Sequence, residues 1–233
     1  MADIRAQLGA EEDEEEPEYV QYKVILLGDG AVGKTSLAMR FCEDHFATQY
    51  KQTIGLDFFI KRVVLPGDVH VCMQIWDIGG QSIGGKMIGN YIYGSNAVVL
   101  CYDITNYTSF QHLEDWYQLV KRTFDGNPRP LVALMANKMD LGHMRTVKVE
   151  KHTQFAEEND LYSYFASARS GEQVQPSFFR IAADLAGVTL SKPELEVAQA
   201  PTTAELINHQ RNDPSHPDVS AQDISKGRNC CVM

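Results

Sequence analysis

A glycine-rich loop between a buried strand and a helix constrains the fold of this chain more than any other feature. Residues 22–27 form the run Tyr-Lys-Val-Ile-Leu-Leu, and residues 28–35 continue it as Gly-Asp-Gly-Ala-Val-Gly-Lys-Thr. This order fits the pattern G-x-x-x-x-G-K-[S/T], in which backbone N–H groups surround phosphate oxygens. A glycine-rich turn before a purely structural helix is the alternative. Because a strand and a helix flank the motif in the required order, we interpret it as a phosphate-binding loop.

The fixed residue types of this loop each have a physical role. The glycines let N–H groups approach a phosphate without an intervening side chain, and the following helix adds the positive end of its dipole. Lys34 supplies a cation for the β- and γ-phosphates, and the Thr35 hydroxyl can bind Mg²⁺. The loop alone does not choose among GTPases, ATPases and nucleotide kinases.

The tetrapeptide Asn137-Lys138-Met139-Asp140 predicts the base. It follows a second buried-strand pattern at residues 131–136. The Asp140 carboxylate can accept hydrogen bonds from guanine N1–H and the 2-amino group, whereas adenine offers no such donor pair, and an unpaired carboxylate costs a few kcal/mol. Taken alone, the tetrapeptide is a common polar turn after a strand. Its place downstream of a phosphate-binding loop makes guanine the predicted base.

Strand and helix patterns alternate along the chain. Expected strands cover residues 22–27, 58–65, 69–76, 97–102, 131–136 and 162–166, and expected helices cover 34–44, 109–122, 148–158 and 174–187. The connection at residues 66–68 is too short for a crossover, so the second and third strands pair antiparallel. We therefore expect an α/β fold whose six-stranded sheet is mostly parallel, with one antiparallel strand and helices on both faces. Ligand loops gather at the carboxyl ends of such strands.

The chain resembles a small GTPase of the Ras superfamily, specifically a Rab, from about residue 20 to residue 190. The resemblance rests on GDGAVGKT at 28–35, YKQTIGLDF at 50–58, WDIGGQ at 76–81, LCYDIT at 100–105, NKMD at 137–140 and SAR at 167–169. The DIGGQ string and the GGKM continuation at 84–87 resemble the divergent Rab-twenty-eight-like branch. The resemblance implies the small-GTPase P-loop fold and hydrolysis of GTP to GDP and phosphate.

The resemblance also implies which residues bind GTP and Mg²⁺. The GTP-binding residues are Asp29, Gly30, Ala31, Val32, Gly33, Lys34, Thr35, Ser36, Phe46, Tyr50, Thr53, Gly80, Asn137, Lys138, Asp140, Ser167, Ala168 and Arg169. The metal ligands are Thr35, Thr53 and, through a water, Asp77.

Two of these assignments have alternatives, and a third residue departs from the family pattern. Phe46 is assigned to the guanine edge, but an apolar residue beside a helix also fills cores. A lone aspartate after a strand often caps a helix or a turn, which is the alternative role for Asp77. Its position before Gly80-Gln81 favours metal binding. Arg169 stands where the family usually has lysine, which preserves the charge and changes the fine geometry.

Hydrolysis requires a water held in line with the γ-phosphate. Gln81 is the candidate that positions it, Lys34 is the second candidate catalytic residue, and Gly30 leaves room for the water. Without an arginine in cis, we expect unaided turnover on the order of 10⁻⁴ s⁻¹, and a partner protein to accelerate it by about 10⁵-fold. Loss of the γ-phosphate would release Thr53 and Gly80 together, which is an order–disorder switch. The expected effector-binding residues are Lys51, Gln52, Ile54, Gly55, Leu56, Asp57, Phe58 and Phe59.

The second switch loop departs from the Rab pattern. Most Rabs read DTAGQE, whereas residues 77–82 read Asp-Ile-Gly-Gly-Gln-Ser, and glycines also stand at positions 84, 85 and 89. Each glycine adds backbone entropy, roughly 0.5–1 kcal/mol relative to alanine. We hypothesise that this loop orders only with GTP and a partner bound; ordinary family drift is the alternative.

The charge of the chain lies mostly in its tails. Net charge is −10 over 233 residues, and residues 1–20 hold eight acids against one base. We expect three parts: a disordered acidic extension at 1–20, a GTPase domain at 21–190 and a flexible tail at 191–233. The acidic balance argues against a nucleic-acid partner, and the acidic extension is repelled by anionic lipid; contact with a basic partner is a further possibility for it.

No signal for another cellular compartment is visible. We find no run that would span a membrane and no signal peptide, so we expect a cytosolic domain. We interpret Cys42, Cys72 and Cys101 as small apolar side chains in the core. The seven histidines do not have the spacing of metal ligands.

The chain ends in Cys230-Cys231-Val232-Met233. If these four residues act as a C-a-a-X box, Cys230 carries one farnesyl group. A single lipid chain anchors a protein to a membrane only marginally. Rabs ending in paired cysteines commonly carry geranylgeranyl on both, which we favour; an unlipidated terminus is the remaining alternative. The protein would then cycle between cytoplasm and endomembranes.

Three classes of function follow from these motifs. We favour a GTP/GDP switch that recruits effectors in vesicle traffic, with endosomes as the expected membranes, and that works with an exchange factor, a GTPase-activating protein and an escort or GDI-type chaperone. A metabolic phosphotransferase would need a second substrate pocket and an arginine-bearing lid, and neither is visible. A GTP-locked scaffold conflicts with the presence of Gln81 and Gly30.

Overall fold

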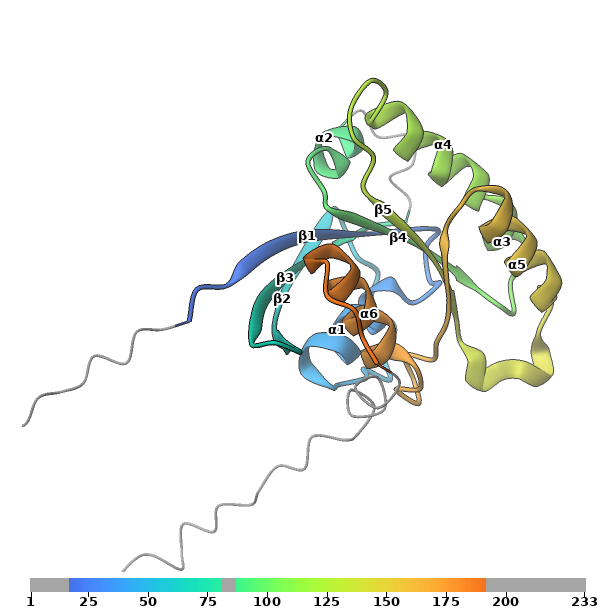
Figure 1. The fold of residues 1–233 in the computed structure, drawn as a ribbon. Helices are drawn as coiled ribbons and strands as arrows, with labels where there is room; N and C mark the ends of the chain where they lie inside the picture. The colour runs from blue at the N-terminus through green and yellow to red at the C-terminus, as the bar shows by residue number, and fades with distance from the viewer. Residues whose placement is uncertain (1–16, 81–86, 192–233) are drawn as a thin grey trace, which may run out of the picture. The chain divides into compact units, whose positions relative to one another are not determined.

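The computed structural model describes residues 17–80 and 87–191, which contain one six-stranded sheet in the order β2-β3-β1-β4-β5-β6 (Figure 1). The strands are β1 (Val20–Leu27), β2 (Leu56–Leu65), β3 (Val69–Ile78), β4 (Ala97–Asp103), β5 (Leu131–Asn137) and β6 (Tyr162–Phe165). Strand β2 pairs antiparallel with β3, and all other neighbouring strands pair in parallel. The predicted sheet with one antiparallel strand is therefore confirmed.

Helices cover both faces of the sheet. They are α1 (Lys34–Glu43), α2 (Ile88–Ile92), α3 (Tyr107–Gln111), α4 (Leu113–Thr123), the 3₁₀ segment η1 (Met139–Met144), α5 (Val149–Glu158) and α6 (Val174–Ala186). Figure 1 shows α1 and α6 on one side of the sheet and α2, α4 and α5 on the other, and the two apolar clusters divide in the same way.

Strand β1 is covered by helices on both faces, which explains why its sequence does not alternate between polar and apolar residues. Val24 and Leu26 pack in the cluster that includes α1 and α6, whereas Ile25 and Leu27 pack in the cluster that includes α4. All four side chains are fully buried. A central parallel strand covered on both faces needs such a continuous apolar run, and the phosphate-binding loop therefore starts from a rigid position.

The expectation of one helix over residues 109–122 is wrong. The structure has α3 and α4 instead, separated at His112. Helix α3 begins earlier than expected because the Asn106 side chain caps it, accepting a hydrogen bond from the Ser109 N–H at 3.3 Å. Helix α2 and the segment η1 were not expected, since five or six residues are too few to show a helical period.

Several strands extend beyond their apolar cores. Strand β3 continues to Ile78 and β5 to Asn137, because backbone pairing does not require apolar side chains: Leu56 pairs with Ile78, and Asp103 with Asn137. Asp77 and Asn137 are thus fixed within the sheet at its carboxyl edge. Both are predicted site residues.

The cysteines behave largely as expected. Cys72 and Cys101 are buried and Cys42 is partly exposed, all with free thiols. Burial raises the pKa of the Cys42 and Cys101 thiols to about 12, so neither is a reactive thiolate. Within residues 17–80 and 87–191, no helix is long and apolar enough to cross a bilayer.

Candidate functional site

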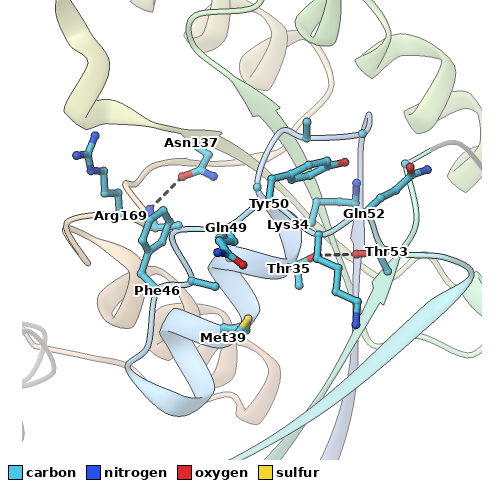
Figure 2. A pocket seen from close by; sticks show the side chains of 18 of the residues that line it. Lys34, Thr35, Met39, Phe46, Gln49, Tyr50, Gln52, Thr53, Asn137 and Arg169 are labelled. Atoms are coloured by element: carbon cyan, nitrogen blue, oxygen red, sulfur yellow. Dashed lines mark hydrogen bonds between the residues drawn. The ribbon is translucent and has the colours of Figure 1, made fainter.

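A pocket of about 980 Å³ lies at the carboxyl edge of the sheet (Figure 2). The predicted nucleotide residues that line it are Gly30, Ala31, Gly33, Lys34, Thr35, Ser36, Phe46, Tyr50, Thr53, Gly80, Asn137, Lys138, Asp140, Ala168 and Arg169. The remaining three, Asp29, Val32 and Ser167, each form a hydrogen bond with a residue that lines the pocket. The fold therefore brings together segments that are separated by more than a hundred residues.

Two glycines of the phosphate-binding loop are required by its backbone. Gly28 and Gly33 have φ angles of +138° and +97°. A Cβ on Gly28 would collide with the Cys101 carbonyl, and one on Gly33 with the Asn137 side chain. By contrast, a Cβ on Gly30 would meet no protein atom within 4 Å, so a side chain there would extend into open space beside the pocket.

The Lys34 ammonium lies inside the loop. Its Nζ donates hydrogen bonds to the carbonyls of Gly28 and Asp29 at 2.7 and 2.8 Å, and the residue is 5% exposed. Burial lowers the pKa of Lys34, an effect that the Asp77 carboxylate opposes. A cation held by neutral carbonyl groups can turn to an anionic ligand without breaking an ion pair.

The predicted metal ligands meet in one cluster of oxygens. Thr35 Oγ1 lies 2.8 Å from Thr53 Oγ1 (Figure 2). Thr35 Oγ1 also donates to Asp77 Oδ2 at 2.5 Å, and Thr53 Oγ1 lies 3.3 Å from the same oxygen. Asp77 is fully buried, and its Oδ1 has no hydrogen-bond partner. Burial raises the pKa of Asp77, against the hydrogen bond from Thr35.

This cluster fits a hard divalent cation. Mg²⁺ binds hydroxyl and carboxylate oxygens, and a cation would compensate the unpartnered carboxylate oxygen of Asp77. Over the part of the chain that the structure describes, no group of three or more His, Cys, Asp or Glu side chains offers a different metal site.

Asn137 joins the phosphate side of the pocket to the base side. The side chain is 1% exposed; its Nδ2 donates to the Val32 carbonyl at 2.9 Å, and its Oδ1 accepts from the Ala168 N–H at 3.1 Å. The N–H of Ala168, a residue that the resemblance assigns to GTP binding, is therefore bonded to Asn137 in this structure. Lys138 reaches the Ala31 carbonyl at 3.0 Å and Asp103 at 2.7 Å.

The predicted base-reading carboxylate is held in place. Ser167 Oγ donates to Asp140 Oδ1 at 2.6 Å, and Arg169 Nη1 lies 4.0 Å from Asp140 Oδ2. Ser167 is fully buried and acts through Asp140 rather than facing the pocket. Phe46 lines the pocket and also packs against the core. Its position thus agrees with contact to the nucleotide and with the alternative, core filling.

The predicted effector segment lies beside the same pocket. Of its residues, Lys51, Gln52, Ile54, Asp57, Phe58 and Phe59 line the wall. Gly55 accepts a hydrogen bond from the Gly79 N–H at 2.9 Å, and Leu56 starts β2. Ile54 is 90% exposed, and Tyr50 and Phe58 of the same stretch are exposed as well.

Close packing requires the glycines at the start of the second switch loop. A Cβ on Gly80 would collide with the backbone of Asp29 and Gly30, and one on Gly79 would crowd the Thr53 carbonyl. Glycine at these two positions thus has a steric cause besides its flexibility. Gln81, Gly84 and Gly85 lie outside the described residues, as do Cys230 and Cys231, so the structure does not bear on their predicted roles.

Sequence reasoning missed Arg40, a residue of α1. Its Nε donates to the Ala168 carbonyl and its Nη2 to the Arg169 carbonyl, both at 3.0 Å. These contacts join positions more than a hundred residues apart, and a single arginine on a helix gives no sequence signal for them.

Comparison with known proteins agrees with this geometry. Residues 23–186 match the family model described as the Ras family. The chain belongs to the Ras family of small GTPases. A Rab-28 protein of Caenorhabditis elegans is 40% identical over 212 residues, which cover 87% of this chain and 86% of that protein. Rab-5A of Dictyostelium discoideum is 36% identical over 173 residues, covering 74% and 85%.

A plant relative extends the comparison along nearly the whole chain. RABA1h of Arabidopsis thaliana is 31% identical over 225 residues, covering 97% of this chain and all of that protein. Together these relatives place the chain among the Rab GTPases, which confirms the predicted family and the resemblance to Rab-28 proteins. This Ras-family GTPase binds guanine nucleotide and hydrolyses GTP.

Proposed function

We propose that this Rab GTPase is a GTP/GDP switch that recruits effector proteins to endomembranes, at endosomes, during vesicle traffic. The observation that carries the proposal is the position of Thr53. Its hydroxyl belongs to the Thr35–Asp77 oxygen cluster, and the next residue, Ile54, is the most exposed large apolar side chain of the described residues. Loss of the metal or of the γ-phosphate would release Thr53, and the position of the adjacent exposed side chain of Ile54 would change with it.

Mg²⁺ is the proposed cofactor, held by Thr35, Thr53 and Asp77. When bound, the ion neutralises charge on the β- and γ-phosphates. The protein contributes the two hydroxyl groups and one buried carboxylate that select a small hard cation. The loop amides and Lys34 bind the phosphates, and Asp140 reads the base.

For hydrolysis, we assign the positioning of the attacking water to Gln81 and stabilisation of the phosphate charge to Lys34. The open space at Gly30 leaves room for the water. We expect turnover on the order of 10⁻⁴ s⁻¹ without a partner, so that a GTPase-activating protein and an exchange factor set the state of the switch.

Single-turnover hydrolysis of GTP tests this proposal against a GTP-locked scaffold. Wild-type protein loaded with GTP should release phosphate slowly, and Gln81→Leu should reduce that rate at least tenfold while leaving GTP binding intact. Gln154→Leu is the matched control, since the Gln154 side chain bonds to Glu158 on the surface of α5. Equal and negligible hydrolysis by all three proteins would favour the scaffold.

Membrane attachment is proposed to use geranylgeranyl groups on Cys230 and Cys231, with a GDI-type chaperone returning the protein to the cytosol. Mass spectrometry of the native C-terminus should show two lipids. One farnesyl on a methylated Cys230 would overturn this part. Tagged wild type should lie on endosomes, and Thr35→Asn, which weakens the metal site, should lose that location.

A further inference from the structure

The Asp29 carboxylate bonds through one oxygen to α4 and through the other to His112, the residue just before it. Trp116 Nε1 donates to Oδ1 at 3.0 Å, and His112 Nδ1 lies 2.6 Å from Oδ2. Trp116 is 1% exposed, so its N–H needs a partner inside the protein, and Asp29 supplies it. His112 stands at the junction of α3 and α4, which is where the expected single helix is broken.

The backbone of Asp29 belongs to the phosphate-binding loop. Its carbonyl accepts a hydrogen bond from Lys34 Nζ at 2.8 Å. The backbone of Gly80, the residue assigned to sensing the γ-phosphate, lies so close that a Cβ there would collide with the Asp29–Gly30 peptide. Asp29 is therefore in contact with α4, with the loop lysine and with the start of the second switch loop.

The direction of the Asp29 side chain matters because of its charge. A carboxylate turned toward nucleotide phosphates would repel them. The donors His112 and Trp116 bind it instead, and Asp29 does not line the pocket although Gly30 and Ala31 beside it do. The same bonds fix the loop backbone whose carbonyl holds Lys34.

We propose that His112 and Trp116 are positioning residues for the nucleotide: by holding the Asp29 carboxylate away from the phosphates, they slow nucleotide release. The proposal rests on the phosphate-binding role assigned to residues 28–35. It adds a structural element, the start of α4, to the parts of the chain that control the lifetime of the bound state.

Release of a fluorescent GDP analogue in Mg²⁺ tests this. His112→Leu and Trp116→Phe each remove one donor and should accelerate release about three- to tenfold. His112→Asn keeps a nitrogen donor at the position of Nδ1 and should stay within about twofold of wild type. Tyr117→Phe is the matched control on the same helix, because it removes a hydrogen bond to the Asn159 carbonyl without contacting Asp29.

A double-mutant cycle separates positioning from a general loss of packing. In an Asp29→Ala background no carboxylate remains to be held, so His112→Leu should no longer accelerate release. The inference is overturned if His112→Leu and Trp116→Phe release the nucleotide at the wild-type rate, or if His112→Leu accelerates release equally in both backgrounds. Failure of the wild-type protein to bind GDP would instead overturn the proposed function.

Discussion

At the scale of single residues, we propose that the choice of base depends on one carboxylate with a fixed orientation. Asp140 lies at the end of the pocket that Asn137 links to the phosphate-binding loop, and Ser167 holds one of its oxygens at 2.6 Å. A carboxylate fixed in this way accepts from two neighbouring donors of a ligand, which guanine has and adenine lacks. On this proposal, the preference for guanine is a property of Asp140 and of its support by Ser167.

Replacing Asp140 by Asn tests this. The amide offers one acceptor and one donor, so GTP should bind on the order of 100-fold more weakly, and a xanthine nucleotide, which presents a carbonyl in place of the 2-amino group, should bind better than GTP. Competition against a fluorescent nucleotide measures both. Unchanged GTP affinity in this variant would show that Asp140 does not read the base.

The metal site makes a second prediction at this scale. Asp77→Asn removes the negative charge from the cluster with Thr35 and Thr53, so the Mg²⁺ concentration that half-maximally slows GDP release should rise at least tenfold. Titration of Mg²⁺ during release measures the shift. The same Mg²⁺ dependence in variant and wild type would exclude Asp77 from the site.

At the scale of elements, α1 connects the two halves of the pocket. It begins directly after the phosphate-binding loop, and from its second turn Arg40 donates to the carbonyls of Ala168 and Arg169. Gln175 of α6 adds a bond to the Phe41 carbonyl at 2.9 Å. Helix α1 thus holds the base-side loop in addition to the loop's own backbone bonds, such as the one from the Gly171 N–H to the Ser167 carbonyl at 2.8 Å.

Arg40→Ala should therefore loosen the loop at 167–171. We expect faster amide hydrogen exchange in that loop and release of GDP about three- to tenfold faster, since two hydrogen bonds from a charged group are lost. Arg122→Ala is the control, because the Arg122 side chain donates to the Gln118 carbonyl of its own helix. Wild-type exchange in the loop of the Arg40 variant would contradict this account.

The elements also show how far sequence reasoning extends. Strand β1, the loop after it and the tetrapeptide at 137–140 were predictable, because burial on both faces and ligand chemistry leave local patterns. The break at His112 was not, since Asn106 caps one helix while the bonds from His112 and Trp116 reach a residue more than eighty positions away. Arg40 was missed for the same reason: its partners are set by the fold.

At the scale of the whole molecule, one buried histidine links stability to pH. His152 is fully buried between Tyr102 and Ser163, with ring nitrogens 3.1 and 2.7 Å from their hydroxyl groups. Burial, and to a lesser degree Arg145, lowers the pKa of His152 to about 4 from 6.5. The folded chain keeps the ring neutral where the unfolded chain protonates it.

Stability should therefore fall as the pH drops below 6.5, and continue to fall until about pH 4. The unfolded state binds the extra proton in this window, so His152 should remove about 2 kcal/mol of unfolding free energy between pH 7.5 and 5. Urea unfolding of wild type and His152→Gln at the two pH values measures this. The variant should lose less stability than wild type; equal losses would contradict the effect.

The most direct test of the whole account is nucleotide competition at the intact protein. With Mg²⁺ present and a fluorescent GDP analogue bound, GTP should displace the analogue at comparable concentrations, whereas ATP should require an excess of about 1,000-fold or more. ATP competing as well as GTP, or no binding of either nucleotide, would contradict the central claim that this pocket selects a guanine nucleotide.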